Sequence, residues 1–154
     1  MKWYVLRFAS SRYTPVFKFL TLNKITWFCP MKNCIYRRPD QSSIRTRQIP
    51  AFPGYLFVEM DFNTVHPEKL AAFQHIYGLV TFCNEPVPVP PKIMETILKW
   101  NWEEGTPVLR GKKNIPHRFA EILGMEEPLK RSFALLNYLT ESYSQSQKEA
   151  KHEA

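Results

Sequence analysis

Residues 49–61 combine a proline–glycine turn with a short apolar strand, and this combination constrains the fold more than any other part of the chain. Pro50 and Pro53 fix φ and lack an amide donor, while Gly54 supplies backbone freedom, so a turn is expected there. The next five residues, from Tyr55 to Glu59, are mostly aromatic and aliphatic, which is typical of a strand at the centre of a sheet. We therefore expect a β-sheet built around this strand.

The pattern of apolar residues predicts the other elements. In a strand over residues 2–8, Trp3, Val5 and Arg7 would face one way and the residues between them the other. Further strands are expected over residues 25–30 and 78–83, and a hairpin over 34–38 and 44–48. Helices are expected from about Thr14, over 68–75 and over 91–100, where the proline-rich connector 86–91 ends.

Composition limits the class of protein. The chain has 154 residues, 44% of them apolar and 14% aromatic, which is enough for one domain with an appendage or for two small domains. Its uncharged stretches are too short to span a bilayer, and its first residues are unlike a signal peptide. Three cysteines without a CxxC pair indicate reduced thiols, so we expect a cytoplasmic protein and no membrane partner.

Charge is distributed unevenly along the chain. Residues 1–50 hold ten Lys or Arg and one acid, a net charge of +9, whereas the remainder has a net charge of −2. A basic excess confined to one third of the chain indicates a surface for a polyanion such as nucleic acid. The alternative is a solvated basic surface that serves solubility.

The last third fits two kinds of structure. Phe119, Ile122 and Leu123 fit a helix that ends at Gly124, and a second helix would carry Leu129, Phe133, Leu136, Leu139 and Tyr143. A short turn between them would make an antiparallel helical hairpin. Several segments of the same region could also be strands, although the periodicity favours helices.

Five short motifs occur in order along the chain: Trp3-Tyr4, Cys29-Pro30, Pro-Gly-Tyr-Leu-Phe-Val at 53–58, Gly-Leu-Val-Thr-Phe at 78–82, and Pro-Val-Pro at 88–90. Together they resemble the NusG family of transcription elongation factors, over about residues 2–100. The chain is most similar to the specialised RfaH-like paralogues, including plasmid-borne ones. The resemblance is weaker after residue 105, where the glycine-rich core of an ordinary KOW domain is replaced by Asn-Ile-Pro-His-Arg at 114–118.

The resemblance implies an α+β fold, with a NusG N-terminal-type antiparallel sheet flanked by helices. We expect this domain over residues 1–100, a linker over 101–112, a KOW-related C-terminal unit over 113–145 and a disordered tail over 146–154. The C-terminal unit is expected as a helical hairpin, the alternative being a KOW-type β-barrel. In RfaH this unit rests on the N-terminal domain as helices and can refold as a barrel.

A NusG-like domain implies an apolar surface that binds the β′ clamp helices of RNA polymerase. The residues at matching positions are Tyr4, Phe52, Tyr55, Phe57, Phe82, Met94 and Ile97, with Phe52 and Tyr55 expected to be exposed. The alternative for each is ordinary core packing. The same surface would receive the hairpin through Phe119, Ile122, Leu123, Phe133, Leu136 and Leu139. His66 stands where RfaH-like proteins contact a second polymerase element, although a loop histidine is the alternative.

The resemblance also implies DNA binding on the opposite face, where Arg7, Arg12, Lys18, His75 and Tyr77 are the candidates for the non-template strand. Tyr77 stands where RfaH has an arginine, so the DNA sequence read cannot be carried over. The implied function is a non-enzymatic antitermination factor that reduces pausing and termination. We expect a monomer whose C-terminal unit could recruit a ribosomal protein or another factor.

Two other functions would use parts of the same sequence. A stand-alone nucleic-acid-binding protein would use the basic third without polymerase. A nuclease would need a lysine after the acids of Glu59-Met60-Asp61, and that lysine is absent. Cys29 and Cys34 lack zinc-site spacing, so we expect no metal and no cofactor.

Overall fold

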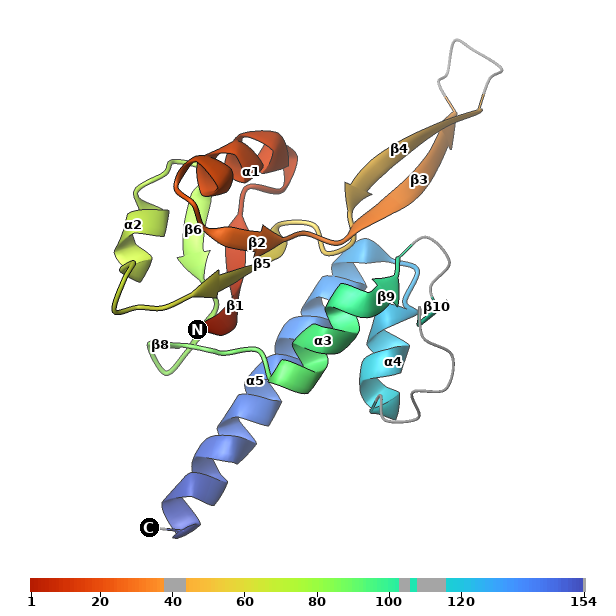
Figure 1. Cartoon of the computed structure of the whole chain (residues 1–154). Coiled ribbons are helices and arrows are strands. Elements are labelled where there is room, and N and C mark those ends of the chain that lie inside the picture. The colour runs from red at the N-terminus through yellow and green to blue at the C-terminus, as the bar shows by residue number, and fades with distance from the viewer. Residues whose placement is uncertain (38–43, 103–105, 108–115, 154) are drawn as a thin grey trace.

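A computed structural model provides the structure of the chain (Figure 1), and it describes residues 1–37, 44–102, 106–107 and 116–153. The strands are β1 (Lys2–Phe8), β2 (Thr26–Phe28), β3 (Met31–Arg37), β4 (Ile44–Pro50), β5 (Tyr55–Met60), β6 (Ile76–Leu79), β7 (Thr81–Phe82), β8 (Glu85–Pro86), β9 (Trp100–Asn101) and β10 (Thr106–Pro107). The helices are the 3-10 turn η1 (Ser10–Arg12), then α1 (Tyr13–Leu22), α2 (Pro67–Ala71), α3 (Pro91–Lys99), α4 (His117–Leu123) and α5 (Pro128–Glu153).

The central sheet has four antiparallel strands in the order β2-β5-β1-β6. The strand predicted after the proline–glycine turn is β5, and it lies between β1 and β2 as expected for a central strand. Gly54 has a φ of 84°, a left-handed conformation that favours glycine, and it closes the turn into β5. The predicted α+β fold, an antiparallel sheet flanked by helices, is confirmed.

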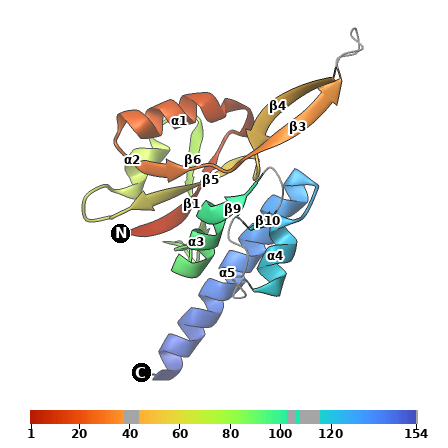
Figure 2. The same cartoon turned by 45° about the vertical axis from the view of Figure 1, so that its right-hand side comes forward.

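The two faces of the sheet support separate hydrophobic cores. One face carries Tyr4, Leu6 and Phe8 of β1 and packs against α1 and α2, which we call the α1-side cluster. The other face carries Val5 of β1 and Phe57 of β5 and packs against α3, α4 and α5, which we call the α5-side cluster. Figure 2 shows the resulting layers, with α1 above the sheet and the last three helices below it. The alternation predicted for β1 is confirmed.

Two hairpins stand outside the central sheet. β3 and β4 pair over seven residues from Met31↔Pro50 to Arg37↔Ile44, and this ribbon projects from the body of the molecule (Figure 1). The strand predicted over residues 78–83 is divided into two pieces with different partners. β6 pairs with β1, whereas the chain turns at Cys83 and Asn84 so that β7 pairs with β8. Both turn residues adopt a left-handed φ, of 53° and 65°.

The C-terminal region is helical, as predicted, with α4 and α5 joined by a short turn into an antiparallel pair that we call the C-terminal hairpin. A disordered tail was expected over residues 146–154, but α5 continues to Glu153, so this expectation is wrong. The residues after position 144 include Gln, Lys, Glu and Ala, which have high helix propensity. Most of the expected linker lies outside the described residues, but Trp102 at its start is buried in the α5-side cluster.

Candidate functional site

The α5-side face of the N-terminal elements is a continuous apolar surface. It is built from alternate residues of the sheet, from the turn before β5, from the proline-rich connector and from one side of α3. Its buried members are Val5, Ala51, Phe52, Phe57, Val80, Val87, Val89, Ile93, Met94, Ile97, Trp100 and Trp102. An apolar surface of this extent is rare on a soluble monomer unless another element covers it. Here the cover comes from the end of the chain.

The C-terminal hairpin covers this surface. From α4, Phe119, Ile122 and Leu123 enter the α5-side cluster, and from α5, Leu135 and Leu139 do so. The spacing of these residues places them on one side of each helix. The two helices are tied together by Arg118 of α4, whose Nη1 lies 2.6 Å from a carboxylate oxygen of Glu141 in α5.

Arg131 of α5 fastens the hairpin to the turn before β5. Its side chain is buried, with 2% of the residue exposed. Nε donates to the carbonyl of Ala51 at 2.7 Å, Nη1 donates to the carbonyl of Met125 at 2.6 Å, and the guanidinium carbon lies 5.8 Å from the centre of the Phe52 ring. Burial lowers the pKa of Arg131 from its ordinary value, but a guanidinium remains charged in proteins. The positive charge is therefore held by one carbonyl group across the interface, that of Ala51, and by one in the turn between α4 and α5, that of Met125.

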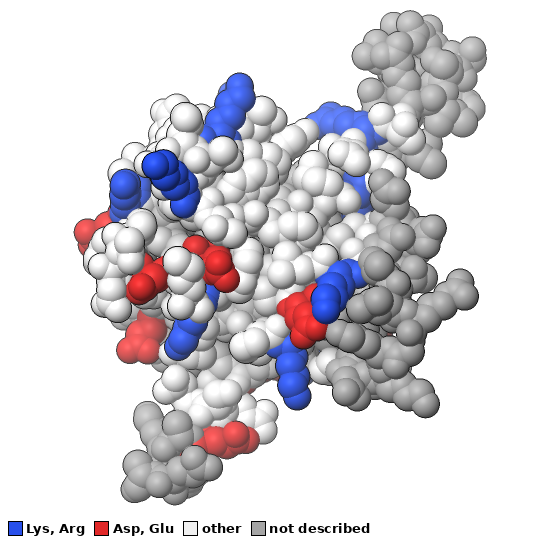
Figure 3. Space-filling view, viewed as in Figure 1, with Lys and Arg blue, Asp and Glu red and all other residues white. Residues whose placement is uncertain are grey.

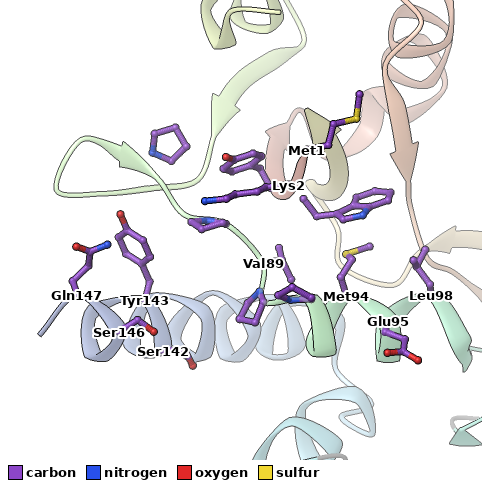
Figure 4. A pocket seen from close by; sticks show the side chains of 16 residues that line it. Met1, Lys2, Val89, Met94, Glu95, Leu98, Ser142, Tyr143, Ser146 and Gln147 are labelled. Atoms are coloured by element: carbon purple, nitrogen blue, oxygen red, sulfur yellow. The ribbon is translucent and has the colours of Figure 1, made fainter. Parts of the chain in front are cut away.

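A groove of about 740 Å³ remains between the hairpin and the N-terminal elements, and we call it the Trp3 groove. Figure 4 shows α5 along one side and the connector and α3 on the others, with Tyr143 pointing towards the connector. Tyr143 donates to a carboxylate oxygen of Glu85 at 3.1 Å, and its ring meets Phe82 edge-on at 6.2 Å. These two contacts hold α5 beside the β7–β8 hairpin.

A smaller pocket of about 280 Å³ lies at the other end of the covered face, and we call it the Arg7 pocket. Arg7 pairs with Tyr55 on one side and with Gly78 on the other, so the three residues form a row across neighbouring strands. Tyr77 from β6 and Phe133 from α5 also line the pocket. It therefore has walls from both the sheet and the hairpin.

The structure divides the predicted nucleic-acid residues between two faces. Arg12 and Lys18 are exposed on η1 and α1, whereas Arg7 and Tyr77 line the Arg7 pocket on the hairpin side. The expectation that all of them share one face is wrong, because alternation along β1 turns Arg7 away from α1. Figure 3 shows lysine and arginine side chains over α1 and acidic side chains around α2.

His75 joins the α1 side through aromatic contacts. Its ring meets Phe73 edge-on at 5.4 Å, and Phe73 stacks on Phe19 of α1 at 4.6 Å. Phe19 and Phe73 were not among the predicted residues. The alternation of aromatic and basic residues at 17–19 was the signal that could have identified the first of them.

The residues predicted to bind polymerase lie in different environments. Phe57, Met94 and Ile97 are buried in the α5-side cluster, and Tyr55 and Phe82 are partly buried against it. Tyr4 belongs to the α1-side cluster, where it stacks on Phe62 at 4.7 Å, and it also lines the Trp3 groove. His66 is exposed as the N-cap of α2, where its Nδ1 accepts from the amide of Glu68 at 3.2 Å.

Two expectations about exposure are wrong. Phe52 is 0% exposed, because Arg131 and Trp102 cover its ring. Phe133 is 65% exposed, because the buried side of α5 runs through Ser132, Leu135 and Leu139. Of the other residues predicted for the hairpin contact, Phe119, Ile122, Leu123 and Leu139 are buried in the α5-side cluster and Leu136 packs against it.

Among the described residues, no group of three His, Cys, Asp or Glu side chains could hold a metal ion. No helix among the described residues is long and apolar enough to cross a membrane. Burial raises the pKa of the Cys29 thiol to about 12, which makes it an inert core residue.

The comparisons with known proteins identify the N-terminal elements. A solved structure of NusG from Thermotoga maritima, described for its domain interaction, is similar at 28% identity with a TM-score of 0.42. The similarity covers 64% of this chain and 55% of that one, so the chain spans about half the length of that relative. No curated protein matches the chain. The family model described as "Transcription termination factor nusG" matches residues 1–98, and the chain therefore belongs to the NusG family of transcription factors.

Proposed function

We propose that this protein is an RfaH-like elongation and antitermination factor that binds RNA polymerase through its α5-side face. The observation that carries the proposal is the C-terminal hairpin seated on the apolar face of the family-matching region. In the free chain the hairpin buries this face, and on the polymerase the β′ clamp helices take its place. The protein acts by binding, as members of this family do, rather than as an enzyme.

Competition between hairpin and polymerase follows from their shared surface. Phe57, Met94 and Ile97 are buried under the hairpin, so no second partner reaches them while it is in place. The apparent affinity for polymerase is therefore reduced by the fraction of molecules whose hairpin is displaced. A factor that binds elongating polymerase more tightly than paused polymerase shifts the equilibrium towards elongation.

DNA contact belongs to the α1 side in this proposal. Arg12 and Lys18 would attract the phosphates of the non-template strand, and the Phe19–Phe73 stack with His75 lies beside them. A second candidate function, nucleic-acid binding without polymerase, is favoured by the same basic third of the chain. Tight binding of free DNA or RNA that falls steeply with salt, without any affinity for polymerase, would support that second candidate.

The decisive experiment measures binding to core polymerase with and without its β′ clamp helices. We expect the full chain to bind the intact enzyme only. Leu135→Asp should strengthen this binding, because a buried charge displaces the hairpin. Asn137→Asp, at an exposed position of the same helix that lines neither the groove nor the pocket, is the control and should leave the affinity unchanged. Binding that persists without the clamp helices would refute the proposal.

We also propose that residues 1–100 and 113–145 are separate units and that the second can refold. Circular dichroism of residues 101–154 alone distinguishes the cases. A β-type spectrum would support a KOW-like barrel in the released unit, whereas a helical spectrum would indicate a permanent hairpin.

A further inference from the structure

The buried side of α5 changes its chemistry along the helix. Moving from its start, the positions that face the N-terminal elements include Ser132, Leu135 and Leu139, and then Ser142, Tyr143 and Ser146. Steps of three or four residues join Ser132, Leu135, Leu139, Ser142 and Ser146, and Tyr143 follows Leu139 by four, so all six positions lie on one side of the helix. Leucines fill the first half of the interface. In the second half, serines occupy positions at which leucines would continue the apolar interface between α5 and the N-terminal elements.

The Trp3 groove lies where the serines begin. Ser142, Tyr143 and Ser146 form its α5 wall, and Figure 4 shows their ribbon running past the connector towards the C-terminus. A serine side chain ends two atoms from Cα, so it leaves unfilled the space that a leucine would occupy. The volume of about 740 Å³ is well within the range of sites that hold a ligand or an anchoring side chain.

The groove is continuous with the covered face. Val89 and Met94 belong both to the α5-side cluster and to the lining of the groove. Beyond them, Trp3 is partly buried and Leu98 of α3 is 45% exposed. The hairpin therefore covers only part of one apolar surface, and the part around Trp3 and Leu98 remains open to solvent.

The chemistry of the groove fits a helix of a partner protein. A helix already occupies the adjoining half of the same surface through aliphatic side chains, so the shape suits a second amphipathic helix. Glu95 on the wall lies 2.8 Å from Lys99, whereas Lys2 makes no ion pair with any described residue. An occupant with acidic residues beside its apolar side chains would complement Lys2.

We infer that the Trp3 groove is the first docking site of a polymerase clamp helix, which then displaces α5 from its serine-containing end. This inference rests on the proposed function. The partner gains apolar contact at Trp3 and Leu98 before any hairpin contact is lost. Displacement then proceeds from Tyr143 towards Leu139 and Leu135, so polymerase binding does not wait for the hairpin to open spontaneously.

The two routes differ in their kinetics. If the hairpin must open first, the observed association rate reaches a plateau at high polymerase concentration, set by the opening rate. If docking at the groove comes first, the rate keeps rising with concentration over the same range. Stopped-flow fluorescence with the full chain and core polymerase measures this dependence.

Variants of the groove test the assignment of residues. Leu98→Asp should lower the association rate constant about tenfold, because it places a charge in the docking site, while the exposed Leu22→Asp on α1 should not. Leu98 lies outside the α5-side cluster, so hydrogen exchange in α5 should be unchanged in this variant. A rate constant unaffected by Leu98→Asp would overturn the inference.

Filling the groove from within provides a second test. Ser142→Leu with Ser146→Leu extends the leucine side of α5 and should weaken polymerase binding about tenfold. Gln145→Leu makes a similar change at an exposed position outside the groove, and should have no effect. Unchanged binding by the filled variant would also overturn the inference. A chain that does not bind intact polymerase at all, even with Leu135→Asp, would instead refute the proposed function.

Discussion

Replacing Arg131 by methionine tests how firmly the C-terminal hairpin is held on the N-terminal elements. Methionine keeps most of the length of the side chain but removes its charge and both donated hydrogen bonds. The carbonyl of Ala51, a fully buried residue, would lose this donor. A hydrogen bond from a charged donor contributes about 1.5–3 kcal/mol, and an unsatisfied buried acceptor costs about 1–3 kcal/mol.

Burying the guanidinium opposes these gains, because a charge removed from water carries a desolvation penalty of several kcal/mol. The two short hydrogen bonds and the contact with the Phe52 ring offset most of this desolvation penalty. We expect the hydrogen-bond loss to dominate, so that the closed arrangement weakens by about 2 kcal/mol. That difference raises the population with a displaced hairpin about thirtyfold.

Native-state hydrogen exchange measures this population directly through the amides of α5. Lys130→Met is the matched control, because Lys130 is the exposed neighbour on the same helix and its ion pair, with Glu127 at 3.2 Å, lies within the hairpin. Exchange in α5 should accelerate about thirtyfold in Arg131→Met and remain unchanged in the control. Slower or unchanged exchange in Arg131→Met would show that desolvation of the guanidinium outweighs its bonds.

The remaining predictions concern acidity, backbone conformation and thiol reactivity. The hydrogen bond from Arg118 lowers the pKa of Glu141 below its ordinary 4.5; the resulting stability is complete above that pH and lost as the pH falls through the lowered pKa. Thermal melts at pH 7 and pH 3 should therefore differ less for Glu141→Gln than for the unmodified chain. Gly54→Ala should destabilise the protein by about 1–3 kcal/mol in denaturant unfolding, because φ is 84° and the added Cβ would lie 3.3 Å from a carbonyl oxygen, whereas Gly124→Ala should be nearly neutral. The buried Cys29 thiol, with a pKa of about 12, should resist iodoacetamide at pH 8 until the protein is denatured, as peptide mass mapping would show.

Local pattern predicted the N-terminal elements well, because each depends on nearby residues. Alternation over residues 2–8 assigned both faces of β1, and the proline–glycine turn located β5. The ends of the helices and strands were harder to predict from local pattern. α2 ends at Ala71 rather than near His75, and beyond its end Phe73 stacks on Phe19 of α1 while His75 meets Phe73 edge-on. That contact joins segments far apart in the chain and leaves no periodic signal.

The hairpin interface shows where sequence reasoning reached its limit. Leu129 and Phe133 fit an apolar heptad as well as Leu135 and Leu139 do, so the pattern alone could not select the buried side of α5. Packing selected the side that carries Arg131, a residue type that is rarely buried. Its partners are main-chain carbonyls, which sequence does not distinguish. The exposed Phe133 and the buried Arg131 are thus two results of one rotation of the helix.

The separation of the two cores has a consequence for cooperativity. Every buried member of the α1-side cluster lies between Tyr4 and Leu79, whereas the α5-side cluster draws residues from the whole described chain up to Leu139. Loss of the hairpin therefore removes contacts from one side of the sheet and none from the other. The chain should lose its structure in two steps, with an intermediate whose sheet, α1 and α2 remain native. Selection can then tune the affinity of the hairpin without endangering the fold on which it rests.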